Sequence, residues 1–150
     1  MGFLDSINIS ASALTAERLR MDVISNNIAN ANTTRTEDGL PYRRRVVVFQ
    51  SVEPKSEFYQ IWRQELTEGE INSGHGVRVA EIALDNSPFR RIYDPTHPDA
   101  GSDGYVQFPN VNVVTEMVDL ISATRAYEAN VTSLNASKSI VLKALEIGRS

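Results

Sequence analysis

The C-terminal part of the chain carries the pattern that most constrains its fold. Apolar or otherwise compatible residues recur there at alternating intervals of four and three, and neither Gly nor Pro interrupts residues 113–147. This rhythm is typical of a helix that packs along a continuous seam. The seam positions are Val113, Met117, Leu120, Thr124, Tyr127, Val131, Leu134, Lys138, Val141 and Leu145. At about 1.5 Å per residue the helix is roughly 50 Å long, so we expect it to need a partner helix.

The N-terminal part repeats this pattern in a weaker form. Four apolar residues fall seven apart, namely Ile7, Leu14, Met21 and Ile28. They predict a helix that begins near Asp5 and ends near residue 30. Because Arg18 and Ser25 occupy alternate seam positions, we do not expect this helix to be stable alone. Asn112 and Gly148 are the expected N-cap and C-terminal residue of the longer helix.

Helix breakers divide the chain into three parts. All six prolines lie between residues 41 and 109, and residues 3–38 and 110–147 contain neither Pro nor Gly. The sequence therefore predicts an N-terminal helical arm (1–36), a small β-rich middle domain (37–109) and a C-terminal helical arm (110–150). The predicted fold class is α+β, with the two arms paired as an antiparallel coiled coil. An ordinary helical hairpin within a monomeric α+β fold is the alternative.

Within the middle part, β-branched residues predict strands at Tyr42–Phe49 and Val77–Leu84. Phe58, Ile61 and Trp62 are interpreted as part of a core. The segment 54–76 is a candidate insertion on an outer surface.

The polar composition of the long helix favours assembly over a monomer. Its positions outside the seam are largely Ser, Thr, Asn and Ala, whereas a helix facing water usually carries more Glu, Lys and Arg. Val114, Val118 and Ile121 add a second apolar edge beside the seam. Two edges indicate more than one neighbouring helix.

Composition argues against several classes of function. The net charge of −4 disfavours nucleic acid as a partner, and no run of 18 apolar residues predicts a membrane span. The N-terminus lacks the pattern of a cleaved signal peptide. The acidic residues near His97 do not have the spacing of an EF-hand, and no catalytic constellation is evident. We therefore expect no enzyme activity, no catalytic residue, no cofactor and no metal. We interpret Arg43–Arg45 as a solvated strand edge or as residues that form salt bridges, rather than as a nucleic-acid or lipid patch.

Four asparagines, Asn26, Asn27, Asn30 and Asn32, lie within seven residues at the end of the N-terminal arm. The end of a helix explains one or two of them through Asx turns or a left-handed residue, but not all four. The run from Met21 to Asn30 and the run from Asn110 to Asn130 resemble the terminal signatures of the bacterial flagellar rod and hook axial protein family. Together with Pro41–Arg44 and Tyr93–Pro95, they resemble the C-type branch of proximal rod proteins within that family.

This resemblance implies a structural subunit of the flagellar basal-body rod. Its terminal helices would polymerise into the tube that crosses the periplasm, transmits motor torque and encloses the export channel. The implied partners are copies of itself, other rod proteins and the type III export apparatus, which would export the chain without a cleaved signal. The expected subunit-interface residues are Ile7, Leu14, Met21, Asn26, Asn27, Ile28, Asn30, Asn32, Met117, Leu120, Tyr127, Asn130, Val131, Leu134, Val141 and Leu145. Thr34–Thr36 departs from the family, where a Gly and an aromatic residue are common.

Two other classes of function remain as alternatives. A generic coiled-coil adaptor would share the heptads but not the asparagine signature. A peptidoglycan-cleaving accessory would need a pair of carboxylates in a cleft, and the acidic group Glu65, Glu68 and Glu70 is better explained as a solvated loop.

Overall fold

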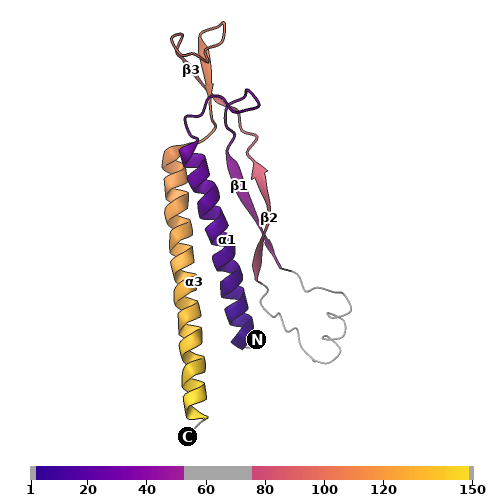
Figure 1. Cartoon of the computed structure of the whole chain (residues 1–150), viewed down its shortest axis with the longest axis vertical. Coiled ribbons are helices and arrows are strands. Elements are labelled where there is room, and N and C mark those ends of the chain that lie inside the picture. The colour runs from indigo at the N-terminus through magenta and orange to yellow at the C-terminus, as the bar shows by residue number, and fades with distance from the viewer. Residues whose placement is uncertain (1–2, 53–75, 149–150) are drawn as a thin grey trace, which may run out of the picture. The chain divides into compact units, whose positions relative to one another are not determined.

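The computed structural model describes residues 3–52 and 76–148. Its elements in chain order are α1 (Phe3–Ala29), β1 (Arg45–Ser51), β2 (Val77–Leu84), β3 (Arg90–Tyr93), β4 (Tyr105–Phe108) and α3 (Val113–Ile147) (Figure 1). Helices thus flank a β region, and the predicted α+β class is confirmed. Among the described residues, neither helix is apolar enough over sufficient length to cross a membrane. The predicted core cluster of Phe58, Ile61 and Trp62, and nearly all of the segment 54–76, lie outside the described residues.

The chain divides into two compact units. The first unit comprises Met1–Glu17, Phe49–Ala80 and Ala126–Ser150, and the second comprises Arg18–Val48 and Glu81–Arg125. Each unit contains part of both helices. The units therefore do not follow the predicted divisions at residues 36 and 109, and the three-part division stays a prediction.

The long C-terminal helix has the bounds that the sequence predicts. Asn112 caps it, because its side-chain Oδ1 accepts a hydrogen bond of 3.1 Å from the backbone N–H of Val114. The backbone carbonyl of Asn112 accepts the first helical bond from Glu116. The N-terminal helix begins at Phe3, slightly before the predicted start, and ends at Ala29.

The strands form two small sheets, β1 with β2 and β3 with β4. The strand β2 matches its prediction, whereas β1 begins at Arg45 rather than at Tyr42. Before β1, the backbone N–H of Tyr42 donates to the carbonyl of Thr33 and that of Arg44 donates to the side chain of Asn110. The β3–β4 hairpin, which the sequence analysis did not predict, is antiparallel with Tyr93 opposite Tyr105.

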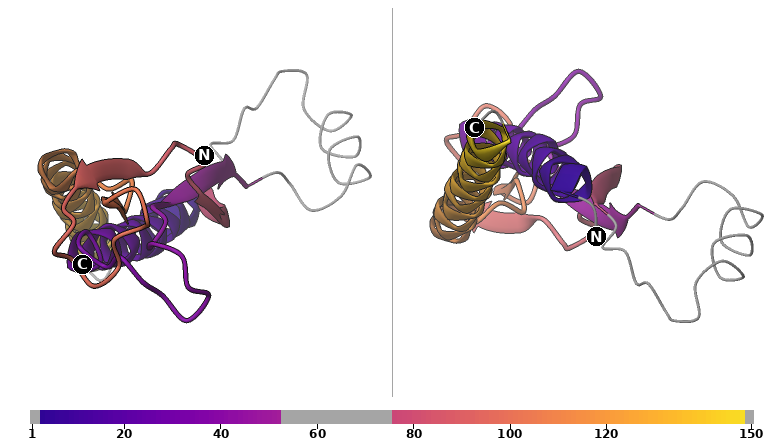
Figure 2. Two further views of the ribbon diagram at one scale, coloured as in Figure 1. Left: turned by 90° about the horizontal axis from the view of Figure 1, so that it is seen from above. Right: turned by 90° about the horizontal axis from the view of Figure 1, so that it is seen from below.

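Within the second unit, the end of α1 and the start of α3 run antiparallel and side by side (Figures 1 and 2). Asn27 is hydrogen-bonded to Glu116, and the hydroxyl of Thr124 lies 3.6 Å from the sulfur of Met21. Within the first unit, a hydrogen bond of 3.4 Å joins the hydroxyls of Ser6 and Ser137. The coiled-coil geometry itself stays a prediction.

Only one side of α3 is buried within the chain. Its two buried residues are Glu116 and Ala123. The predicted seam consists of two sets of positions, each spaced by seven residues. In the set that begins with Val113, Val113 is exposed but the later members are half-buried, namely Leu120, Tyr127, Leu134 and Val141. In the other set Val131 is half-buried, and the exposed members are Met117, Thr124, Lys138 and Leu145. The inner side of α3 therefore carries these half-buried apolar residues together with small and polar residues such as Ala123 and Glu116.

Candidate functional site

The most connected group of side chains in the second unit surrounds Asn27. Asn27 is 1% exposed, and its Nδ2 donates to the backbone carbonyl of Arg45 at 2.8 Å and to Oε2 of Glu116 at 2.9 Å. Its Oδ1 accepts from the backbone N–H of Arg45 and from the hydroxyl of Tyr42, each at 3.0 Å. An amide side chain offers two donors and two acceptor positions, so all of them are used.

Glu116 joins this group from the first turn of α3. Its side chain is 1% exposed, and its Oε1 accepts a hydrogen bond of 2.7 Å from Nε of Arg44. Both carboxylate oxygens therefore have partners. A buried carboxylate is costly unless it is paired and hydrogen-bonded, and Glu116 meets both conditions. Its place in the first helical turn adds the favourable dipole of the backbone.

Arg44 connects Glu116 to two further acids. Its Nη1 lies 3.5 Å from Asp85 and its Nη2 lies 3.4 Å from Asp119. Burial alone would lower the pKa of the Arg44 guanidinium, but the hydrogen bond and charge of Glu116, with Asp85 adding to them, raise this pKa above its ordinary value. Arg44 is thus held in its charged form, and the interpretation of Arg43–Arg45 as salt-bridging residues is confirmed for Arg44.

Asn110 adds a further tie between these segments. Its Oδ1 accepts from the backbone N–H of Arg44, and its Nδ2 donates to the backbone carbonyls of Asp85 at 2.9 Å and Ser87 at 3.3 Å. Hydrogen bonds from the side chain and backbone of Ser87, together with Arg44, lower the pKa of the Asp85 carboxyl. We call Asn27, Tyr42, Arg44, Asn110 and Glu116 the polar junction.

The polar junction brings together three segments that are distant in the sequence. Asn27 comes from α1, Tyr42 and Arg44 precede β1, and Asn110 and Glu116 come from the start of the C-terminal arm. Burial raises the pKa of the Tyr42 hydroxyl, so this group stays protonated and donates to Asn27. A small apolar cluster of Ala31, Tyr42 and Val111 is also buried within the second unit. The arrangement ties these backbone segments to one another through hydrogen bonds.

The acidic loop after β3 does not hold a metal site in the described part of the chain, where no group of three or more His, Asp or Glu side chains is placed to bind an ion. Asp94 accepts hydrogen bonds from the backbone and hydroxyl of Thr96, which lower the pKa of its carboxyl. Nδ1 of His97 accepts from the backbone of Asp99. These side chains stabilise the turn itself.

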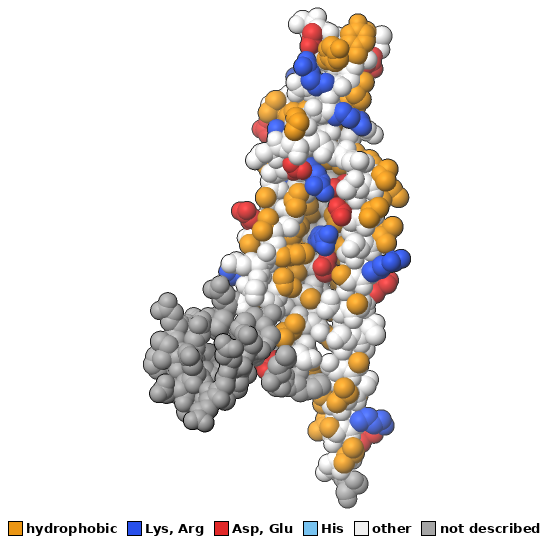
Figure 3. All heavy atoms as spheres, turned by 180° about the vertical axis from the view of Figure 1, so that it is seen from behind, with side chains coloured by type: hydrophobic (Ala, Val, Ile, Leu, Met, Phe, Trp, Pro, Cys, Tyr) orange, Lys and Arg blue, Asp and Glu red, His pale blue; other side chains and the backbone are white. Residues whose placement is uncertain are grey.

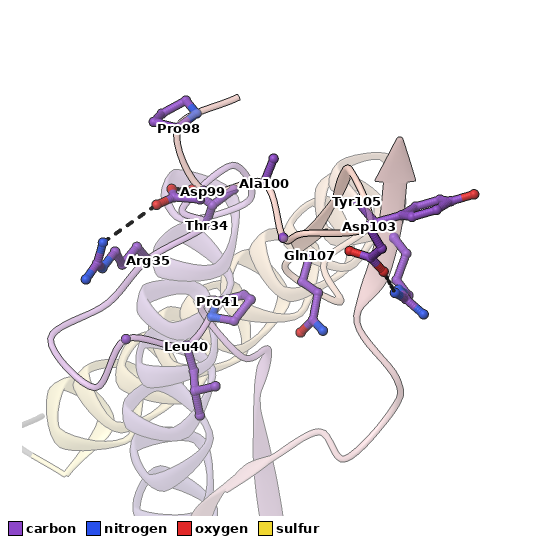
Figure 4. A pocket seen from close by; sticks show the side chains of 13 residues that line it. Thr34, Arg35, Leu40, Pro41, Pro98, Asp99, Ala100, Asp103, Tyr105 and Gln107 are labelled. Atoms are coloured by element: carbon purple, nitrogen blue, oxygen red, sulfur yellow. Dashed lines mark hydrogen bonds and ion pairs between the residues drawn. The ribbon is translucent and has the colours of Figure 1, made fainter. Parts of the chain in front are cut away.

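An open hollow of about 470 Å³ lies within the second unit, between residues 34–41 and the loop before β4 (Figure 4). Its charged side chains are already paired, Arg35 with Asp99 at 3.9 Å and Arg91 with Asp103 at 2.8 Å. The hydroxyl of Thr34 also donates to Asp99 at 2.7 Å. This hollow therefore offers mostly satisfied polar groups to a ligand.

The four asparagines of the motif differ in their surroundings. Asn27 belongs to the polar junction, whereas Asn30 closes the end of α1 by donating to the backbone carbonyl of Asn26 at 2.9 Å and accepting from Thr33. Asn26 and Asn32 are exposed. All four keep negative φ, so none supplies the left-handed residue considered for this helix end.

The other expected interface residues differ in exposure. Those that are half-buried are Ile7, Leu14, Met21, Ile28, Leu120, Tyr127, Asn130, Val131, Leu134 and Val141, and those that are exposed are Met117 and Leu145. Asn130 donates to the backbone carbonyl of Ala126 within its own helix. The interface itself stays a prediction for all of these residues.

Sequence reasoning missed Glu116 and Asn110 as members of a site. An acid in the first turn of a helix is expected near the positive end of the backbone dipole, and a solvated Glu would satisfy that preference equally well. One signal was available, since Glu116 lies in step with Ala123 and Asn130 at intervals of seven. Small side chains let another segment approach this side of the helix closely, and a carboxylate enclosed there is tolerated only when it is paired.

Comparison with known proteins gives consistent matches at both ends of the chain. Residues 7–35 match the family model described as "Flagella basal body rod protein". Residues 102–147 match the model described as "Flagellar basal body rod FlgEFG protein C-terminal".

Curated relatives extend this similarity over the whole chain. The chain is 52% identical to the flagellar basal-body rod protein FlgC of Bacillus subtilis, over 96% of this chain and 97% of that protein. The corresponding protein of Borreliella burgdorferi is 51% identical over 98% of both chains. That of Escherichia coli O157:H7 is 39% identical over 99% of this chain and its own full length.

Proposed function

The chain belongs to the flagellar basal-body rod protein family, and on that premise we propose that it is a structural subunit of the proximal rod. In this proposal it polymerises through its terminal helices into a tube that transmits motor torque and encloses the export channel. Its partners are copies of itself, other rod proteins and the export apparatus that delivers it without a cleaved signal. Its place is the part of the basal body that crosses the periplasm.

The observation that carries this proposal is the apolar surface of α3. In the second unit, Val114, Met117, Val118 and Ile121 are each more than half exposed. In the first unit the same is true of four large side chains near the end of the helix, namely Ile140, Leu142, Leu145 and Ile147. The space-filling view shows many apolar side chains at the surface (Figure 3). Such a surface is typical of a chain that packs against other proteins.

The apolar core inside the chain is small by comparison. Among the described residues, eight apolar residues are buried and three of these are Ala, whereas eighteen large apolar residues are exposed and nine of these lie on α3. Full burial of one such side chain contributes about 1.5–3 kcal/mol. Covering part of this surface in an assembly would therefore contribute on the order of 10 kcal/mol, which is comparable to what the larger buried residues of the core supply.

A genetic complementation experiment tests the proposal. A strain that lacks the chain should not swim and should have no complete rod, and the full-length chain should restore both. Chains truncated in either helical arm should not restore them. The single substitutions Leu14→Asp and Leu134→Asp, which place a charge on half-buried apolar positions, should also prevent incorporation into the rod.

The matched control is Glu128→Ala, since Glu128 is an exposed residue of α3 whose side chain is not part of the polar junction. This variant should swim normally. Intact rods and normal swimming in the deletion strain would contradict the proposal and would favour the coiled-coil adaptor instead.

A further inference from the structure

We propose that the polar junction sets the register between the parts of α1 and α3 in the second unit, with Glu116 as the positioning residue that selects Asn27. Register here means which residue of one helix lies level with which residue of the other. This inference deepens the proposed function where it concerns rod incorporation, but its first test is made on the purified chain and needs no rod.

The apolar side chains alone do not define this register. With Asn27 level with Glu116, the antiparallel helices place Val23 level with Leu120. A shift of α3 by seven residues, about 10 Å, would place Tyr127 beside Val23, and a shift in the other direction would place Val113 there. A large apolar side chain meets Val23 in all three registers, because both helices repeat at intervals of seven.

The polar side chains distinguish the registers. In the first shifted register Asn27 would lie level with Ala123, whose methyl group cannot accept a hydrogen bond. In the other it would lie level with Pro109, which precedes the helix. Either shift breaks the bond between Asn27 and Glu116 and leaves buried polar groups unpaired, which is strongly unfavourable. A single buried polar residue can fix the register of paired helices in this way.

Arg44 determines which carboxylate oxygen of Glu116 is free to accept a hydrogen bond from Asn27. It occupies Oε1, which leaves Oε2 as the acceptor for Asn27. Arg44 is in turn fixed by the bond from its backbone N–H to Asn110, which lies two residues before the helix cap at Asn112. The carboxylate is therefore held in one position relative to both chain segments.

The register can be read directly with pairs of engineered cysteines, because the natural sequence contains none. Met21→Cys with Thr124→Cys reports the observed register, since these side chains meet at 3.6 Å. Met21→Cys with Val131→Cys or with Met117→Cys reports the two shifted registers. Each pair is oxidised in the purified full-length chain, and the yield of intramolecular disulfide is measured for each.

With the polar junction intact, we expect the pair at 21 and 124 to exceed both shifted pairs by at least about tenfold. In the double variant Asn27→Leu with Glu116→Leu, the ratio of the 21–124 disulfide to each shifted disulfide should fall by roughly tenfold, while the helical circular dichroism signal is retained. Arg44 keeps Asp85 and Asp119 as partners in this variant. If the polar junction only stabilised the fold, the double variant would be less stable but would not give a higher yield of the shifted disulfides.

Two further variants make the result decisive. Glu116→Gln keeps the shape of the side chain and one of its two acceptor contacts. The ratio of the 21–124 disulfide to the shifted disulfides should therefore fall, but by a smaller factor than in the double variant. Glu128→Leu on the exposed side of α3 should leave this ratio of disulfide yields unchanged. An unchanged preference in both Glu116→Gln and the double variant would overturn the proposal, as would failure of the 21–124 pair to form with the junction intact. Normal swimming of the deletion strain would contradict the rod proposal but not this result.

Discussion

The inner and outer sides of α3 in the second unit contrast with each other. The inner side buries Glu116, whose side chain is almost completely excluded from solvent, together with Ala123. The outer side exposes Val114, Val118 and Ile121. A helix of a water-soluble monomer has the reverse distribution, with apolar residues inside and charged residues outside. In the proposed assembly the polar junction ties α3 to its own chain, whereas the exposed apolar side chains of α3 would contact neighbouring subunits.

The largest effect is expected from placing a charge on the outer side. Val118→Asp should abolish swimming and rod incorporation, because burying an unpaired carboxylate in a subunit interface is strongly unfavourable. The same substitution should change the free energy of unfolding of the single chain by no more than about 0.5 kcal/mol, since the position is exposed. Motility assays and denaturant unfolding measure the two quantities separately. Normal swimming would show that the outer side has no apolar partner.

A smaller but measurable effect is expected on the inner side. Glu116→Ala removes an acceptor from Asn27 and from Arg44, and should lower the free energy of unfolding by about 2–3 kcal/mol. Arg44 retains Asp85 and Asp119, so the loss should stay below that for a charge left with no partner. Denaturant unfolding of the purified chain checks this value. A loss below about 0.5 kcal/mol would mean that the junction is not a structural anchor.

The smallest effect concerns Tyr42, which donates a neutral hydrogen bond to Asn27. Tyr42→Phe should lower the free energy of unfolding by about 1 kcal/mol near neutral pH. Because burial raises the pKa of the Tyr42 hydroxyl in the folded chain, its contribution is present below the unfolded pKa of about 10 and is lost as pH rises through the folded pKa. Unfolding measured between neutral pH and about pH 11 should therefore show an alkaline loss in the natural chain that Tyr42→Phe reduces. Identical alkaline profiles would contradict this assignment.

The sequence was informative wherever local rules decide the structure. The bounds of α3 and β2 agree with their predictions, because helix breakers, a capping Asn and β-branched residues act on their immediate surroundings. The terminal motifs also indicated the protein family, which the comparisons confirm. The β3–β4 hairpin was missed, since its strands are short and a loop of eleven residues, 94–104, separates them.

What the sequence by itself determined is thus the two helices, the strand β2, the N-cap of α3 and the family. Only the tertiary structure decided which side of α3 faces inward, because Val, Ile and Met occur on several sides of the helix and apolar periodicity alone cannot rank them. It also decided that Asn27, Arg44 and Glu116 meet. That meeting depends on three segments far apart in the chain, and hydrogen bonds form only between groups that the fold brings within about 3 Å.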